Sequence, residues 1–254
     1  MQESERNPIQ SVGIIGYGNF GAFVRELLQR FAPEVSVKVF TPEKAVDGKT
    51  FFSREEVAVC DAVLFAVPIR EYESALKDTV PLMKQEGVIV DVATVKMHPV
   101  ELVKKYSSGR PYIATHPMFG PESYAKRNKD VANFRIVIAE HTLPADEHSQ
   151  LVDFLKELHF NVIEMSADRH DRNLAETLFL THFIGQVVTQ AGFVRTDIDT
   201  VSFGFLMDAV ESVRADKQLF EDVFRFNPHC AEVMRRVGLA EEEVRKLLTA
   251  TGSR

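Results

Sequence analysis

The first two thirds of the chain alternate between short apolar runs and longer segments with a helical spacing of apolar positions. The apolar runs predict strands over residues 11–15, 35–40, 61–67, 87–92, 112–114, 134–139 and 161–165. The helical spacing predicts helices over residues 21–31, 72–83, 100–106 and 145–158. Near-continuous apolar runs are typical of parallel strands covered on both faces. The alternation predicts an α/β domain over residues 1–165 with a doubly wound, mostly parallel sheet.

From residue 166 onward the pattern indicates helices only. The predicted helices span residues 172–194, 203–213, 218–226 and 240–250. The first of these places His182 and Gln186 on an otherwise apolar face. Such polar residues are either core groups bonded to the backbone or a patch that faces a cleft, and the pattern leaves both interpretations open. We expect this smaller domain, residues 166–254, to complete its core by forming a homodimer.

A glycine pattern, G-x-G-x-x-G, connects the first predicted strand to the first predicted helix. Glycines let the backbone approach a pyrophosphate, and the following helix N-terminus offers N–H groups and a positive dipole end. In this setting the pattern predicts dinucleotide binding, with a plain tight turn as the alternative. The residues assigned to the cofactor here are Gly16, Gly18, Asn19, Phe20 and Gly21. The end of the third strand adds Val67 and Pro68, which are expected near the nicotinamide half.

The end of the second strand bears on the choice of cofactor. A site specific for NAD usually places Asp or Glu there to hold the ribose 2′-hydroxyl. Thr41 stands there instead, and Lys44 follows shortly after. A threonine hydroxyl can bond a 2′-phosphate and a lysine can neutralise it, which favours NADP. Glu43 keeps NAD as the alternative, and Lys44 is equally compatible with a plain solvated lysine.

Residues 115–123, THPMFGPES, follow the fifth predicted strand. Pro117 and Pro121 are expected to exclude a helix, and Gly120 to allow a turn that a side chain would obstruct. The result would be a stiff loop that holds His116 at the carboxyl end of a strand, where open α/β sheets bind ligands. The plainer interpretation is a histidine that caps an ordinary loop. After the fourth strand, Thr94 and Lys96 bring a hydroxyl and an ammonium to a similar position.

Composition narrows the classes of function. The net charge of −7 argues against an electrostatic nucleic-acid surface. Two cysteines, Cys60 and Cys230, form no disulfide framework and no metal-ligand spacing, which is typical of a reducing compartment. Residues 1–10 are predicted to be a loose polar tail without a signal core, and no apolar run reaches 18 residues. We therefore expect a cytoplasmic protein that contacts neither membrane nor nucleic acid and needs no metal.

Five sequence elements carry a resemblance to a known family. They are GIIGYGNFG, DVATVK, THPMFGPES, the pair His170-Asp171 and the pair Thr181-His182. In this order and spacing they resemble the prephenate/arogenate dehydrogenases of tyrosine biosynthesis, and most closely the plant-type arogenate dehydrogenase branch. The resemblance covers roughly residues 11–248. It implies a Rossmann domain followed by a helical dimerisation domain, and an oxidative decarboxylation of arogenate or prephenate with hydride transfer to NADP or NAD.

The resemblance also implies roles for individual side chains. His116 matches the catalytic histidine, which would accept the proton of the substrate's C4 hydroxyl as hydride leaves C4. Thr94 matches a serine or threonine that bonds the same hydroxyl or the histidine. Lys96 would hold its loop near the cofactor, and His182 matches a substrate-site histidine. Gln186 and Ser123 are further candidates for contact with the substrate.

Two departures and one match concern substrate choice. Some bacterial members carry an arginine that grips the ring carboxylate where Glu211 stands, and Arg214 is the candidate to take over. Prephenate-specific members have a second histidine where this chain has Gly185. Asp208 matches an acidic residue of arogenate users, and a carboxylate there would pair with the amine of arogenate and repel prephenate. We therefore expect a preference for arogenate.

The sequence leaves two alternative functions and gives one expectation about inhibition. A reductase of the imine or pyrroline-carboxylate type would join similar domains but would not need the THPMFGPES histidine. A non-catalytic protein that senses NADP would bind cofactor without turnover. Because little chain follows the last predicted helix before Arg254, we expect any inhibition by tyrosine to act at the active site rather than on a separate domain.

Overall fold

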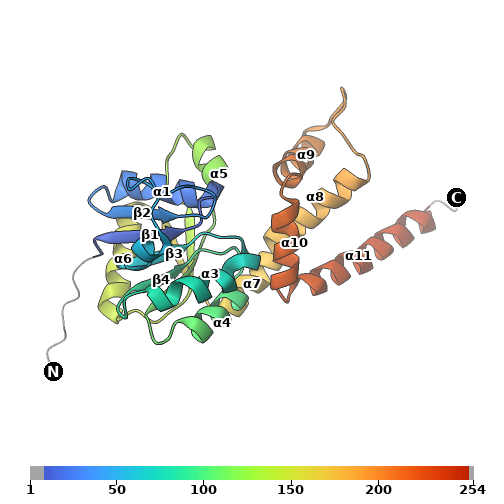
Figure 1. Cartoon of the computed structure of the whole chain (residues 1–254). Helices are drawn as coiled ribbons and strands as arrows, with labels where there is room; N and C mark the ends of the chain where they lie inside the picture. The colour runs from blue at the N-terminus through green and yellow to red at the C-terminus, as the bar shows by residue number, and fades with distance from the viewer. Residues whose placement is uncertain (1–8, 252–254) are drawn as a thin grey trace. The chain divides into compact units, whose positions relative to one another are not determined.

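The computed structural model describes residues 9–251 (Figure 1). Most of the predicted N-terminal tail therefore lies outside the described residues. The chain divides into two compact units between Ala167 and Asp168. We call them the dinucleotide unit and the helical unit, and each is described by itself.

A seven-stranded sheet forms the centre of the dinucleotide unit, in the order β2-β1-β3-β4-β5-β6-β7. The strands are β1 (Ser11–Ile15), β2 (Ser36–Phe40), β3 (Ala62–Phe65), β4 (Val88–Asp91), β5 (Tyr112–Pro117), β6 (Arg135–His141) and β7 (Asn161–Glu164). Strands β5 and β6 pair antiparallel, and the other neighbours pair parallel. The sheet confirms the predicted mostly parallel architecture. Its order reverses between β1 and β3, and ligands bind at the carboxyl ends of strands beside such a reversal.

Helices cover both faces of this sheet. They are α1 (Asn19–Phe31), α2 (Arg54–Ala58), α3 (Tyr72–Thr79), α4 (Met97–Tyr106), α5 (Pro121–Lys126) and α6 (Ala145–Glu157), with short 3₁₀ turns η1 (Ile69–Glu71) and η2 (Val80–Leu82). Successive strand residues point to opposite faces. Phe65 accordingly packs in a core cluster with Leu76 of α3, and Leu64 in another with Val24 of α1. Burial on both faces explains why the strands read as continuous apolar runs.

The segment that carries His116 differs from its prediction. Strand β5 continues through His116 to Pro117, because it pairs antiparallel with β6, and His116 lies opposite Val137. A register shift between Ala114 and Thr115 marks where the strand leaves its regular pairing. The expected loop around His116 is therefore a strand in the structure.

Two further expectations for this segment were wrong. Pro121 does not exclude a helix but begins α5, since a proline suits the first helical position, where its missing N–H is not needed. Gly120 has an extended backbone with φ −144°, and a Cβ added there would meet no atom within 4 Å. A side chain at Gly120 would therefore not obstruct the turn.

Smaller differences follow from local chemistry. The helix predicted over residues 72–83 ends at Thr79, and Pro81 lies in the 3₁₀ turn that follows, where its missing N–H costs no α-helical hydrogen bond. The helix predicted over residues 100–106 already begins at Met97. Its third residue is Pro99, which is tolerated in the first turn of a helix.

The described part of the helical unit contains helices and no strand. They are α7 (Ala167–Leu174), the π-helical turn η3 (Ala175–Phe179), α8 (Leu180–Gln190), α9 (Val201–Val213), α10 (Lys217–Phe226) and α11 (Cys230–Thr251). The first three form the predicted long helix, which ends earlier than expected, shortly before Gly192 with φ +77°. The last helix begins ten residues before its predicted start, at Cys230. These results confirm an all-α C-terminal region.

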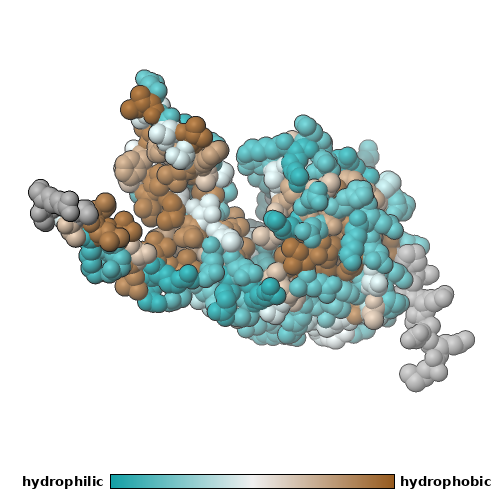
Figure 2. Space-filling model, turned by 180° about the vertical axis from the view of Figure 1, so that it is seen from behind, coloured by the Kyte–Doolittle hydropathy of each residue, from teal (hydrophilic) through white to brown (hydrophobic). Residues whose placement is uncertain are grey.

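The core of the helical unit is small, and many large apolar side chains lie on its surface. Phe179 stacks with Phe220 and Phe224, with ring centroids 5.4 and 5.8 Å apart. Figure 2 shows hydrophobic side chains gathered on this unit. Those exposed by more than half are Phe193, Val194, Ile198, Val201, Phe205, Val244, Leu247 and Leu248. The helical unit by itself therefore leaves many of its large apolar side chains in contact with solvent.

Candidate active site

The glycine turn between β1 and α1 is shaped by contacts that exclude side chains. Gly16 has φ +100°, and a Cβ there would lie 2.6 Å from the carbonyl oxygen of Ala66. A Cβ on Gly21 would lie 2.2 Å from the carbonyl oxygen of Gly16. Gly18 precedes the first turn of α1, and a Cβ there would meet nothing within 4 Å. Packing thus requires Gly16 and Gly21, whereas Gly18 keeps open space over the helix N-terminus, as an incoming pyrophosphate needs.

A cavity of about 440 Å³ lies at the carboxyl ends of β1, β2 and β3. Its lining joins the glycine turn to the ends of the two neighbouring strands. The lining residues assigned to the cofactor from the sequence are Gly16, Gly18, Thr41, Lys44, Val67 and Pro68. Asn19, Phe20 and Gly21 belong to the first turn of α1, which leads away from the same glycine turn. The position at the strand-order reversal is where this fold class binds dinucleotides.

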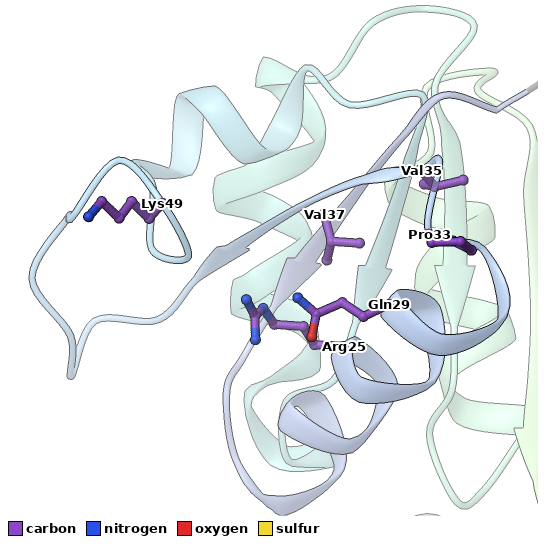
Figure 3. A pocket seen from close by; sticks show the side chains of 6 residues that line it. All are labelled: Arg25, Gln29, Pro33, Val35, Val37 and Lys49. Carbon is purple, nitrogen blue, oxygen red and sulfur yellow. The ribbon is translucent and has the colours of Figure 1, made fainter.

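A second hollow, of about 310 Å³, lies elsewhere on the dinucleotide unit (Figure 3). Arg25 and Gln29 of α1, Val35 and Val37 near the start of β2, and Pro33 and Lys49 line it. Because it faces the start of the edge strand and not the carboxyl ends of the strands, it has no part in the dinucleotide cavity.

The loop after β2 carries a carboxylate as well as a cation. The Thr41 hydroxyl donates a hydrogen bond to the Glu43 carboxylate. This bond is the main reason that the pKa of Glu43 lies below its usual range. Lys44 is exposed. The hydroxyl that was expected to meet a 2′-phosphate therefore serves a neighbouring carboxylate that stays ionised.

A buried ion pair joins the ends of β4 and β5. The Lys96 ammonium, fully buried, pairs with the Asp91 carboxylate and donates to the Thr115 carbonyl at 2.5 Å. The Thr115 hydroxyl donates in turn to the Asp91 carbonyl at 2.8 Å. Burial is the largest influence on Asp91 and raises its pKa, against the charge of Lys96. Lys96 thus fixes the strand end beside His116, and its direct contact with a cofactor stays a prediction.

The two predicted catalytic residues lie just beyond the last paired residues of the neighbouring parallel strands β4 and β5. Asp91 of β4 lies opposite Ala114 of β5, so Thr94 and His116 come after the pairing at the same edge of the sheet. His116 is buried, with 7% of its surface exposed, and Thr94 is half-buried in the bend after β4. The Ser123 hydroxyl accepts from the Gly120 N–H and donates to the Gly120 carbonyl, both at 3.0 Å. Ser123 therefore secures the start of α5, and its contact with a substrate stays a prediction.

In the helical unit, the two polar residues of the predicted long helix differ in their hydrogen bonding. Gln186 donates its side-chain amide to the Arg214 carbonyl at 3.4 Å and so links α8 to α9. His182 is buried, and its Nδ1 has no hydrogen-bond partner among residues 9–251. Burial lowers the pKa of His182, partly offset by the charge of Asp216. Gln186 behaves as a group bonded to the backbone, whereas His182 keeps an unused buried nitrogen, which usually calls for a ligand or water.

An arginine that the sequence analysis did not single out occupies the acidic face of α9. Arg195, from the segment between α8 and α9, contacts Asp208 at 2.5 Å and Glu211 at 2.9 Å. Its hydrogen bond to Glu211 lowers the pKa of that carboxyl, and the two carboxylates raise the pKa of Arg195. Arg214, the predicted carboxylate binder, is exposed. No spacing in the sequence indicates Arg195, because it lies in a loop and not at a helical interval from Asp208.

Comparisons with known proteins agree with this geometry. The family model for the nucleotide-binding domain of prephenate dehydrogenase matches residues 38–164. Arogenate dehydrogenase 2, chloroplastic, of Arabidopsis thaliana is 28% identical over 259 residues, which is 97% of this chain and 72% of that protein. Arogenate dehydrogenase 1, chloroplastic, of the same plant is 29% identical over 262 residues, 96% of this chain but only 40% of that longer protein.

Solved structures share the fold. A prephenate dehydrogenase from Aquifex aeolicus, in complex with hydroxyphenyl propionate and NAD+, superposes with a TM-score of 0.76 at 17% identity and covers 98% of this chain and 94% of its own. A Synechocystis arogenate dehydrogenase gives a TM-score of 0.71 at 16% identity, with 96% and 93% covered. The glycine turn, the cavity and the sheet define a dinucleotide-dependent oxidoreductase. The chain belongs to the prephenate dehydrogenase family, and over nearly its whole length it is similar to plant arogenate dehydrogenases.

The described part of the chain shows neither a membrane-spanning helix nor a cluster of metal ligands. Between residues 9 and 251 no helix is long and apolar enough to cross a membrane. Within the same range, no group of three or more His, Cys, Asp or Glu residues is arranged to hold a metal ion. Cys60 and Cys230 are buried free thiols, and burial raises the pKa of Cys230 to about 12.

Proposed function

We propose that this protein catalyses the oxidative decarboxylation of arogenate to tyrosine in L-tyrosine biosynthesis, with hydride transfer to NADP. The observation that carries the proposal is the placement of His116. A buried ion pair, Lys96 with Asp91, holds the strand end that bears it, at the same edge of the sheet as the dinucleotide cavity. Prephenate, which would give 4-hydroxyphenylpyruvate, is the alternative substrate.

The proposed chemistry needs one base near neutral pH. His116 accepts the proton of the C4 hydroxyl while the C4 hydride passes to the nicotinamide, and the C4 oxygen becomes a carbonyl. The carboxylate at C1 then leaves as carbon dioxide, its electron pair completes the aromatic ring, and the C4 oxygen regains a proton. A histidine suits this task because its unperturbed pKa lies near working pH. Thr94 would bond the same hydroxyl and orient it.

The choice of NADP rests on the loop after β2. No carboxylate occupies the strand end itself, and Lys44 lines the cavity together with Thr41. Glu43 acts in the opposite direction, because its ionised carboxylate can accept a bond from a ribose 2′-hydroxyl. NAD is therefore the alternative hydride acceptor.

The preference for arogenate rests on the acidic face of α9 and on the names of the plant relatives. Asp208 already pairs with Arg195, so the ammonium of arogenate would replace that guanidinium. The proposed test is the ratio of kcat/KM for arogenate over prephenate in Asp208→Asn, which we expect to fall. An unchanged ratio would remove Asp208 from substrate choice.

The experiment for the whole proposal measures the formation of reduced cofactor, crossing arogenate and prephenate with NADP and NAD. Turnover with arogenate and NADP is the expected result. His116→Ala should retain NADP binding and lose turnover by roughly 10²-fold or more, the usual contribution of a general base. Bound NADP without turnover of either substrate would favour a reductase or a cofactor sensor instead.

We also propose that a second copy of the chain covers the apolar surface of the helical unit. The exposed side chains include Phe205 and Ile198, exposed by 71% and 88%. Burial of such a surface against its own copy would complete the small core of the unit. The cytoplasmic location stays a prediction from the sequence.

A further inference from the structure

Arg54 is a cation at the dinucleotide cavity that the glycine pattern does not reveal. It is the first residue of α2 and lines the cavity with Thr41 and Lys44. Its guanidinium carbon lies 4.5 Å from the centroid of the Phe40 ring, and Phe40 is the last residue of β2. Arg54 therefore occupies the strand end where a dinucleotide site selects between a ribose hydroxyl and a ribose phosphate.

The path of the chain explains how a residue so far from the glycine turn reaches this place. After the loop that follows β2, the backbone returns alongside the strand. The Val39 N–H donates to the Thr50 carbonyl at 3.0 Å, and the Phe52 N–H donates to the Val39 carbonyl at 2.9 Å. Helix α2 begins directly after this pairing, capped by Ser53, so its first side chain projects at the end of β2.

The Arg54 side chain is held in place before any ligand binds. Its Nη1 donates to the Thr79 hydroxyl at 3.0 Å, and its Nη2 lies 3.6 Å from the Asp78 carboxylate. Stacking on Phe40 adds a cation–π contact. These contacts do not use all of the N–H donors, since a guanidinium has five, and the remaining donors can bind a ligand. Lys44, in contrast, is an exposed lysine on a flexible stem.

We propose that Arg54, not Lys44, is the principal residue that recognises the 2′-phosphate of NADP, an inference that rests on the proposed function. A planar guanidinium can give two parallel N–H bonds to a phosphate, and its immobilisation lowers the entropy cost of binding. Glu43 opposes it at the same cavity, because its ionised carboxylate repels a phosphate and accepts from a hydroxyl. Arg54 thus favours NADP, whereas Glu43 favours NAD.

The test measures binding to the intact protein by calorimetry, without substrate. The probes are NADP, NAD, 2′,5′-ADP and 5′-ADP, the last pair differing in the site of one phosphate. Arg54→Gln should weaken NADP and 2′,5′-ADP by roughly 10- to 100-fold, the range for hydrogen bonds to a charged group, and NAD by less than about threefold. Arg54→Lys keeps the charge but loses the planar pair of N–H donors, so its affinity for NADP should lie between those of the wild type and Arg54→Gln. Lys44→Gln is the matched control with a smaller loss, and Glu43→Gln should strengthen NADP.

Four outcomes would overturn the assignment. Equal losses for NADP and NAD in Arg54→Gln would make Arg54 a structural residue. A larger loss in Lys44→Gln than in Arg54→Gln would return the role to the loop lysine. Wild-type protein that binds NAD but not 2′,5′-ADP would also reject the inference while leaving the proposed dehydrogenase intact. Failure to bind any of the four probes would overturn the dinucleotide site itself, and the inference with it.

Discussion

The two units of the chain differ in how far they bury their apolar side chains. In the dinucleotide unit, the buried Lys96 and Asp91 satisfy each other, and both faces of the sheet are covered. In the helical unit, Phe205 is exposed by 71%. Unpaired buried polar atoms do not distinguish the units, because among residues 9–251 the helical unit has one, in His182, and the dinucleotide unit has several, including those of Tyr72 and His141. The first unit covers the apolar faces of its sheet by itself. The second has the features of one that needs another surface to cover its apolar side chains.

Removing the buried Lys96–Asp91 ion pair of the dinucleotide unit should have the largest effect on stability. Lys96→Met leaves the Asp91 carboxylate buried without its cation, so we expect a loss of about 3–5 kcal/mol in the free energy of unfolding. Urea unfolding, with hydrogen exchange of β4 and β5 amides as the local readout, measures it.

Lys104→Met is the matched control, since Lys104 pairs with Glu140 at 2.7 Å with its side chain 54% exposed. We expect that exposed pair to contribute less than about 1 kcal/mol. Similar losses for the two variants would show that the buried pair is not what holds the ends of β4 and β5.

A charge on the apolar surface should disrupt the helical unit's proposed self-association without unfolding the first unit. Phe205→Asp removes an aromatic contact twice in a two-fold dimer, at about 2 kcal/mol for each copy. The dimer dissociation constant should rise by roughly 10³-fold, as measured by sedimentation equilibrium.

Val46→Asp makes the same kind of change on the dinucleotide unit, where Val46 is 59% exposed in a loop. We expect its association to match that of the wild type. A wild-type protein that is monomeric at all concentrations, or a Phe205→Asp dimer of unchanged affinity, would refute the proposed interface.

The glycine turn offers a comparison within the dinucleotide unit. Gly21→Ala forces a Cβ to within 2.2 Å of a backbone oxygen, and we expect a loss of about 1–3 kcal/mol in stability. Gly18→Ala places its methyl in open space, so stability should change by less than about 1 kcal/mol. NADP binding, measured separately by calorimetry, should weaken in both variants. Gly18→Ala with unchanged affinity would show that the space over the helix N-terminus does not hold the pyrophosphate.

Sequence reasoning succeeded where the determinants are local. The strands appear as apolar runs because both of their faces are buried, and the glycines appear because Gly16 needs a positive φ. It failed for His116, which lies in a strand only because β6, about twenty residues later, pairs with it. A rule that reads proline as a helix breaker also misread Pro121, whose effect depends on its position in the helix.

In the candidate site, too, the residues with a local sequence signal were predicted and those placed by distant pairing were not. Gly16 and Gly18 were identified from spacing, and the cavity gathers them with Thr41 and Lys44. Arg54 was missed because a backbone pairing between Val39 and residues 50–52 delivers it, and that pairing has no local signature. The capping box that begins α2, Ser53 with Glu56, predicts a helix start there but not its neighbours in space.

The smallest predicted effect concerns the unpartnered histidine of the helical unit. Burial lowers the pKa of His182 in the folded state, so near and below pH 6.5 the unfolded chain binds more protons than the folded chain. Its contribution to stability is therefore complete above about pH 6.5 and falls as the pH drops toward the folded pKa. One proton sets a ceiling of about 1.4 kcal/mol per pH unit on this slope. Hydrogen exchange of α8 and α9 amides between pH 7.5 and 5.5 measures it.

His182→Asn removes the titration and should flatten the slope for the helical unit. His159→Asn is the matched control, because His159 is exposed and its positive φ of 65° suits asparagine. We expect the control to keep the wild-type slope. If His182→Asn keeps it too, then the buried His182 imidazole does not set the pH dependence of the helical unit.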